Sequence, residues 1–259
     1  MRQFFRFLIQ NQTYKLIAIW NHGITEIFSG FGYLYPQPLK APKFPAKTMK
    51  VIAINGSPRV GGNTHHALRM AGEQLEAKGI EFEIIQVGNK NVHGCRDCGK
   101  CRENQNERCV ITSDPLNEWI QKLKQADGII LASPVYYAGI SGAMKCFLDR
   151  TFYVSGSNGN FFRHKVGAAM VALRRSGGTT TLDSLLHYLT YSEMILATSN
   201  YWNIIHGRNH EESLQDAEGM QIMQLLGENM AWLLTMREQT KHSVPAPAPR
   251  PKVMTNFIR

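Results

Sequence analysis

From residue 49 onward, short apolar runs alternate with amphipathic stretches. Residues 50–55 form an apolar run that ends in Gly-Ser-Pro, which is typical of a buried strand entering a turn. Residues 63–78 repeat apolar side chains at helical spacing, and Gly79 predicts the end of that helix. Further strands are expected at 81–87, 127–133, 165–173 and, more weakly, 194–200, and further helices at 113–126, 141–153, 178–190 and 211–236.

This order of elements predicts an α/β fold: a doubly wound, five-stranded parallel sheet with helices on both faces, in three α/β/α layers. In such sheets, ligands bind beyond the carboxyl ends of the strands, near the point where the strand order reverses. Residues with binding or redox chemistry are therefore expected in the loops that follow the strands.

The two ends of the chain lack this regularity. Residues 1–48 have no helical or strand period, and the proline-rich stretch 36–45 is typical of an extended linker. Because Met49 directly precedes the first strand, we interpret 1–48 as an N-terminal extension that is untranslated or disordered, with a targeting or docking arm as the alternative. Residues 241–259 are proline-rich and expected to be disordered. The folded domain is thus expected over 49–240.

The chain contains 29 Lys and Arg against 20 Asp and Glu, which gives a formal net charge of +9. Such an excess often indicates nucleic acid or an acidic membrane surface as the partner. Here residues 1–48 carry +5, residues 241–259 carry +4, and residues 49–240 are neutral. No apolar run approaches the ~18–20 residues that a spanning helix needs. We therefore expect a domain that binds neither nucleic acid nor membrane.

The loop after the first strand is suited to a phosphate monoester. It lacks the Gly-Lys-Ser/Thr of a P-loop and the Gly-x-Gly-x-x-Gly dinucleotide fingerprint. It does offer hydroxyls, an amide, a guanidinium and accessible backbone N–H groups at a helix start, where the helix dipole favours an anion. The residues concerned are Ser57, Arg59, Gly62, Asn63 and Thr64. A plain strand-to-helix turn is the alternative.

Two further loops carry small residues beside aromatic or basic ones. After the third strand, a flat apolar surface with accessible backbone amides can receive a planar ring; it consists of Pro134, Val135, Tyr136, Tyr137 and Gly139. The alternative for this loop is a pair of core tyrosines. After the fourth strand, glycines and hydroxyls again follow a carboxyl end, at Arg175, Ser176, Gly177 and Gly178.

Together these loops resemble the flavodoxin-like NADPH-dependent FMN reductase family, over about residues 49–205. The most specific marks are Gly-Ser-Pro-Arg at 56–59, Gly-Asn-Thr at 62–64 and Ser-Pro-Val-Tyr at 133–136. The resemblance implies that the first loop holds the FMN phosphate, that 134–139 flanks the isoalloxazine, and that 175–178 borders its pyrimidine edge. The flavin would carry the redox chemistry, so no catalytic side chain is expected.

Four of the five cysteines, Cys95, Cys98, Cys101 and Cys109, lie in the polar loop 94–110. Such a set can direct its sulfurs to one centre, which suits zinc or an iron–sulfur cluster. Basic residues surround them, as an anionic cluster would favour. The arrangement resembles the cysteine motif of the iron–sulfur flavoproteins, a branch of the same fold with a 4Fe–4S cluster next to FMN. We expect such a cluster, with reduced thiols or a zinc site as alternatives.

Three other residues receive structural interpretations. Cys146 lies beside Phe147 and Leu148 in a predicted helix and is expected to be a small buried apolar residue. His65 and His66 stand at the start of the first predicted helix. Either could face the phosphate, but we expect solvated side chains.

These features predict an enzyme: an NAD(P)H-dependent, FMN-containing oxidoreductase acting on a small molecule such as a quinone or free flavin, with the cluster as a one-electron relay. The electron donor is expected to be NAD(P)H or ferredoxin. The alternatives are a non-enzymatic electron carrier that docks to ferredoxin-like protein partners, and a thiol redox sensor, which would need a low thiolate pKa. Reduced thiols predict a cytoplasmic protein, and the resemblance implies a homo-oligomer.

Overall fold

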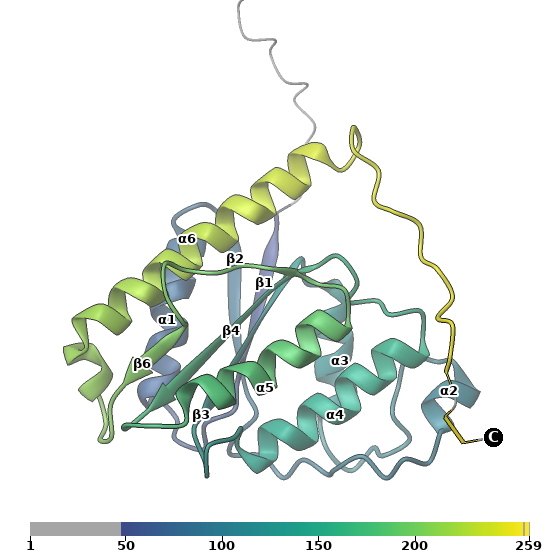
Figure 1. Ribbon diagram of the computed structural model, residues 1–259, viewed down its shortest axis with the longest axis horizontal. Helices are drawn as coiled ribbons and strands as arrows, with labels where there is room; N and C mark the ends of the chain where they lie inside the picture. Colours follow the sequence, from purple (N-terminus) through teal and green to yellow (C-terminus); the bar gives the residue numbers. More distant parts are fainter. Residues whose placement is uncertain (1–47, 256, 259) are drawn as a thin grey trace, which may run out of the picture. The chain divides into compact units, whose positions relative to one another are not determined.

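A computed structural model describes residues 48–255 and 257–258 of the chain, so nearly all of the predicted N-terminal extension lies outside the described residues. The described part contains one parallel sheet in the order β2-β1-β3-β4-β5, with β6 also paired to β4 (Figure 1). The strands are β1 (Lys50–Asn55), β2 (Glu81–Gln86), β3 (Gly128–Pro134), β4 (Val166–Leu173), β5 (Ile195–Leu196) and β6 (Ile204–His206). None of the helices described is both long and apolar enough to cross a membrane.

Helices cover both faces of the sheet, which confirms the predicted three-layer architecture (Figure 1). They are α1 (Asn63–Glu76), α2 (Lys100–Asn104), α3 (Leu116–Gln125), α4 (Gly142–Ser157), α5 (Gly178–Tyr191) and α6 (Ala217–Thr240). On β1, Val51 and Ala53 pack with α1 and α6, whereas Ile52 and Ile54 pack with α3, α4 and α5. Because both faces of the strand are buried, its sequence is a continuous apolar run without alternation.

The prediction for the last strand is only partly right. Near 194–200 the structure has β5, which is two residues long and pairs with the start of β4 through Val166 and Ile195. A second short strand, β6, pairs with the end of β4 through Leu173 and His206. Within residues 48–255, the sheet therefore has six strands rather than five, since two short strands share one edge of β4. Strands of two and three residues are too short to give a periodic pattern.

The last helix begins at Ala217, not at 211 as predicted. The side chain of Asp216 caps it by accepting a hydrogen bond from the backbone N–H of Gly219 at 3.0 Å. Residues Glu212–Gln215 form a separate 3₁₀ helix, η1. The short helix α2, inside the cysteine-rich loop, was not predicted.

The described residues of the proline-rich tail, 241–255 and 257–258, form no helix or strand, yet some of them contact the folded domain. A guanidinium nitrogen of Arg163 donates to the carbonyl of Pro247 at 2.9 Å. The Lys252 ammonium lies 3.8 Å from the ring centroid of Tyr191. The tail therefore runs against α5 and the turn before β4.

Gly227 provides a test of the packing of α6 on α1. A methyl group at Gly227 would collide with the carbonyl of Ala71, whereas one at Gly156 in α4 would meet no atom within 4 Å. We expect Gly227→Ala to lower the free energy of unfolding by about 1–3 kcal/mol through overpacking. The matched Gly156→Ala should raise it by about 0.5–1 kcal/mol, because alanine favours a helix. Urea unfolding measures both, and equal effects would contradict this packing.

Candidate functional site

The loop between β1 and α1 is drawn tightly against β3 and α4. The backbone N–H of Gly56 donates to the carbonyl of Ala132 at 2.8 Å, and the Ser141 hydroxyl donates to the carbonyl of Gly56 at 2.6 Å. A Cβ atom at Gly56 would lie 2.8 Å from the Cβ of Met144, so this approach requires glycine. The loops that follow β1 and β3 consequently lie side by side.

A cavity of about 220 Å³ opens between these two loops. The end of β4 and the residues that follow β4 and β6 complete its wall. Most of the residues predicted to bind phosphate and three of those predicted to bind the ring thus line the same cavity. Its lining residues from the two loops are Ser57, Arg59, Asn63, Thr64, Pro134, Val135 and Tyr136, and those from the strand ends are Ala172, Leu173, Arg174, Gly207 and Arg208. The cavity thus has both polar and apolar groups in its lining.

The two tyrosines are not core residues, so that alternative is wrong. Tyr136 is 48% exposed and Tyr137 is fully exposed. The backbone N–H groups of Tyr136 and Gly139 each donate to the other's carbonyl at 2.9 Å, which closes a tight turn. Within it Tyr137 and Ala138 have φ values of 49° and 57°, a region that non-glycine residues seldom occupy. Strained backbone of this kind occurs preferentially at ligand sites.

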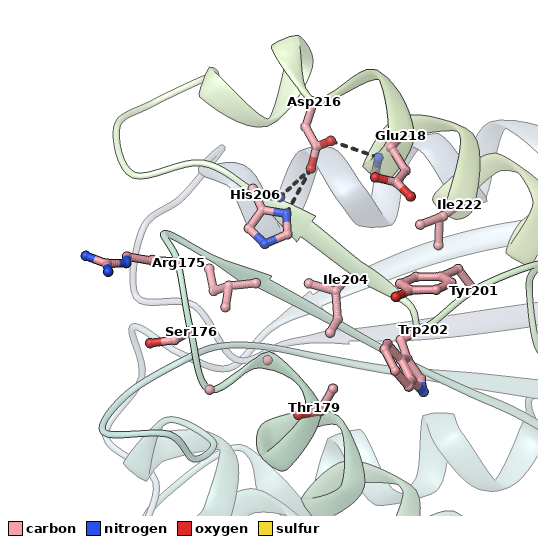
Figure 2. A pocket seen from close by; sticks show the side chains of 14 residues that line it. Arg175, Ser176, Thr179, Tyr201, Trp202, Ile204, His206, Asp216, Glu218 and Ile222 are labelled. Carbon is pink, nitrogen blue, oxygen red and sulfur yellow. Dashed lines mark hydrogen bonds and ion pairs between the residues drawn. The ribbon is translucent and has the colours of Figure 1, made fainter.

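The third predicted loop faces a different cavity. Arg175, Ser176, Gly177 and Gly178 line a neighbouring space of about 300 Å³ (Figure 2). Tyr201, Trp202 and Ile222 line it from the other side, and the Arg175 side chain points outward. None of these four residues lines the first cavity; Leu173 and Arg174, which directly precede them, do.

This third loop nevertheless supports the tyrosine turn. Gly177 has a φ of 84°, and a Cβ atom there would lie 2.8 Å from the Cα of Ala138. The absence of a side chain therefore lets the loop after β4 pack directly against the turn after β3. Contact of residues 175–178 with a flavin stays a prediction.

Segment 207–213, which follows β6, is fastened to residues 57–64, the predicted phosphate loop, although the sequence analysis did not identify it. The Asn63 amide donates to the carbonyl of Asn209 at 2.8 Å and accepts from the backbone N–H of Ser213 at 3.3 Å. The Arg59 guanidinium donates to the carbonyl of Arg208 at 2.9 Å. Two predicted phosphate ligands thus also position this segment. The segment is polar and has no period, so the sequence carried no signal for it.

The four cysteines of the predicted cluster line one small cavity of about 20 Å³. Cys95 and Cys98 are exposed, Cys101 is buried and Cys109 is half-buried. In the part of the chain that the structure describes, no three of their sulfurs lie within 4.8 Å of one another. Tetrahedral zinc with bonds of about 2.3 Å needs sulfurs roughly 3.8 Å apart. The sulfurs are therefore spaced more widely than a compact zinc site requires.

A buried cation, Arg150 of α4, reaches this cavity. Its side chain is 1% exposed, and Nε donates to the sulfur of Cys109 at 3.4 Å. Its other nitrogens donate to the carboxylate of Asp114 at 2.5 Å, to the carbonyl of Ile111 at 3.0 Å and to that of His93 at 3.2 Å. Sequence reasoning attended only to basic residues near the cysteines, whereas Arg150 is 41 residues from Cys109. Its positive charge fits a thiolate or an anionic cluster.

Asp114 holds Arg150 in place. Burial alone would raise the pKa of Asp114, but hydrogen bonds from Arg150 and from the backbone N–H of His93 outweigh burial and lower the pKa below its ordinary value.

Cys146, which we expected to be buried, is instead half-buried on α4. Its sulfur lies 3.8 Å from where a Cβ atom of Gly94 would stand, at the start of the cysteine loop.

Comparison with known proteins gives consistent matches. The family model described as NADPH-dependent FMN reductase matches residues 49–209. An iron–sulfur flavoprotein of Methanocaldococcus jannaschii is 35% identical over 190 residues, covering 71% of this chain and 96% of that protein. One of Methanosarcina thermophila is 30% identical over 195 residues, covering 74% and 99%. An FMN reductase (NADPH) of Escherichia coli is 35% identical over 101 residues, covering 39% and 47%.

Solved structures confirm the flavodoxin-like fold. The structure of RosB superposes with a TM-score of 0.58 at 17% identity, covering 82% of this chain and 94% of that one. A WrbA-like flavodoxin of Agrobacterium tumefaciens has a TM-score of 0.50 at 15% identity, covering 73% and 99%. At such identities the likeness concerns the fold alone.

Arg150→Met tests the buried ion pair. It leaves the Asp114 carboxylate buried without its cation, so we expect the free energy of unfolding to fall by about 3–5 kcal/mol at pH 7. The exposed control Arg102→Met, which loses a contact to the Tyr153 hydroxyl at 3.3 Å, should cost under about 1 kcal/mol.

The same variant has a defined pH dependence. Because the folded pKa of Asp114 is depressed, its stabilising effect in the unmodified chain is present above the unfolded pKa of about 3.9 and is lost as the pH falls through the folded pKa. In Arg150→Met, protonation relieves the unpaired charge instead. The difference in free energy of unfolding between the unmodified chain and Arg150→Met should therefore become smaller between pH 7 and about pH 4. A difference that stays constant over this range in urea unfolding would contradict the pairing.

Proposed function

This chain belongs to the NADPH-dependent FMN reductase family, in its iron–sulfur flavoprotein branch, and on that premise we propose an FMN-dependent oxidoreductase that takes electrons from NAD(P)H. The observation that carries the proposal is the single cavity shared by the loops after β1 and β3. The loop after β1 supplies the cavity with hydroxyls and a guanidinium at a helix start, as a phosphate requires. The loop after β3 supplies Pro134, Val135 and Tyr136, which give a planar ring apolar and aromatic contacts.

The residues of this cavity fit FMN. We assign the phosphate to the hydroxyls of Ser57 and Thr64, to Arg59 and to the backbone at Gly62, with Asn63 beside them. The ring is assigned to the wall formed by residues 134–136, with Tyr137 and Gly139 of the same turn, which do not line the cavity, as further expected contacts. We propose that the pyrimidine edge points toward loop 175–178, which packs on that wall at Gly177 but lines the neighbouring cavity, while Arg174 reaches the FMN cavity itself. Bound FMN supplies hydride and single-electron chemistry, while the protein binds and orients it.

We further propose that Cys95, Cys98, Cys101 and Cys109 hold a 4Fe–4S cluster. Support comes from the gathering of all four cysteines around one cavity and from the buried Arg150 beside Cys109. The relatives named iron–sulfur flavoproteins point the same way. Such a group supplies single-electron transfer, and the positive charge of Arg150 balances its negative charge.

The alternatives differ in what they require of these sites. A thiol sensor needs a lowered cysteine pKa, but burial raises the pKa of the Cys101 thiol. An electron carrier would use the same cysteines with ferredoxin as donor and a protein as acceptor, and the absence of NAD(P)H oxidation would identify it. We propose that the protein is cytoplasmic, because the cysteines need a reducing compartment. We also propose a homo-oligomer, because proteins of this fold commonly form dimers.

Thr64→Ala tests the phosphate assignment. Loss of one charge-assisted hydrogen bond, worth about 1.5–3 kcal/mol, should raise the Kd for FMN roughly 10- to 150-fold. The control is Thr190→Ala on α5, because the Thr190 hydroxyl bonds to the carbonyl of Leu186 at 3.0 Å in its own helix. Quenching of FMN fluorescence gives both constants. If Thr64→Ala and Thr190→Ala bind FMN equally well, the phosphate lies elsewhere.

Cys98→Ser tests the cluster. The protein purified without oxygen should contain about four irons and four sulfides per chain, and Cys98→Ser should lose them. Cys146→Ser should retain them, because Cys146 lies outside the four-cysteine cavity. Metal and sulfide analysis of the three proteins decides the matter. Zinc, or no metal, in the unmodified protein would refute the cluster while leaving the FMN proposal standing.

A further inference from the structure

Three metal-ligating side chains gather beside the phosphate loop, outside both proposed cofactor sites. His66 lies in the first turn of α1, and His210 and Glu211 belong to segment 207–213. One ligand atom of each lies within 4.8 Å of those of the other two. The two imidazole rings meet edge-on at 5.8 Å between centroids, and His210 Nδ1 lies 3.7 Å from a carboxylate oxygen of Glu211. Residues 144 positions apart in the chain thus converge on one point.

His66 is the least expected member of this group. Its Nε2 atom is buried and has no hydrogen-bond partner, although the sequence led us to expect a solvated side chain. Buried polar atoms normally have a partner, so an orphaned ring nitrogen requires an explanation. A neutral imidazole nitrogen with a free lone pair is a preferred ligand of zinc and similar borderline cations.

We propose that His66, His210 and Glu211 bind a divalent cation of the zinc class. Two imidazoles and one carboxylate form a three-ligand set that zinc accepts, with water in the fourth position. Bonds of about 2.0–2.1 Å in a tetrahedron place ligand atoms roughly 3.3 Å apart. His210 and Glu211 are exposed, so their side chains can close the remaining gap by rotation.

The ion would have a positioning role. It joins α1 to segment 207–213, the same segment that Asn63 and Arg59 fasten to the phosphate loop. The His210 ring also lies against that loop, 3.8 Å from where a Cβ atom of Gly61 would stand. Gly207 and Arg208 of this segment line the proposed FMN cavity. Resting on the proposed function, we therefore expect the bound ion to tighten FMN binding.

The primary experiment measures zinc alone, on the full chain without a histidine tag, after chelator treatment and without FMN. Competition with a chromophoric chelator gives the number of zinc ions bound and their Kd. Because the cysteines can also take up zinc, the informative quantity is the difference between variants. His210→Ala and Glu211→Gln should each raise the Kd for one of the bound zinc ions at least about tenfold relative to the unmodified chain. His187→Ala, an exposed histidine on α5, should change nothing.

Identical zinc uptake by the unmodified chain, His210→Ala and Glu211→Gln would overturn the site. Both replaced side chains are exposed, and circular dichroism verifies that each variant folds. A second titration tests the coupling: zinc should lower the Kd for FMN in the unmodified chain but not in His210→Ala. An unchanged Kd for FMN would overturn the positioning role. Failure of FMN to bind at all would refute the proposed function and leave the zinc result intact.

Discussion

The candidate site depends on the parallel pairing of β1 with β3 and of β3 with β4. This register sets Asn55 beside Ala132 and Ala132 beside Met170, so the three strands end at one edge of the sheet. Gly56 then allows the loop after β1 to approach β3 closely enough for a backbone hydrogen bond. The loops after β1 and β3 line one cavity, the proposed FMN site, because these strands end together.

Helix α4 connects this cavity to the cysteines. At the N-terminus of α4, the Ser141 hydroxyl accepts a hydrogen bond from the backbone N–H of Met144 at 3.4 Å and donates one to the carbonyl of Gly56, at the start of the loop after β1. Further along, Arg150 reaches the sulfur of Cys109. One helix therefore fixes both proposed cofactor sites relative to the same strand end. This arrangement links packing to function, because a change in α4 would disturb both sites.

The sequence predicts those parts of the structure that depend on residues close together in the chain. Val51 to Ile54 form an unbroken apolar run, and Gly56 and Thr64 mark the turn into α1, so the strand, the helix and the first loop could all be identified. It does not predict long-range pairs: nothing near Asp114 indicates that Arg150 will neutralise it, and nothing near Asn63 indicates segment 207–213. The position of 175–178 also depends on packing, because Gly177 approaches Ala138 and the loop lines the neighbouring cavity, neither of which the local sequence indicates.

A crystal structure of the full chain with FMN tests the central claim most directly. It should place the phosphate among Ser57, Arg59 and Thr64, and the ring against Pro134 to Tyr136, with Arg174 and Arg208 beside the same cavity. FMN bound instead in the neighbouring cavity, between Gly178 and Trp202, would contradict the claim. In that case the convergence of the loops after β1 and β3 would have another purpose.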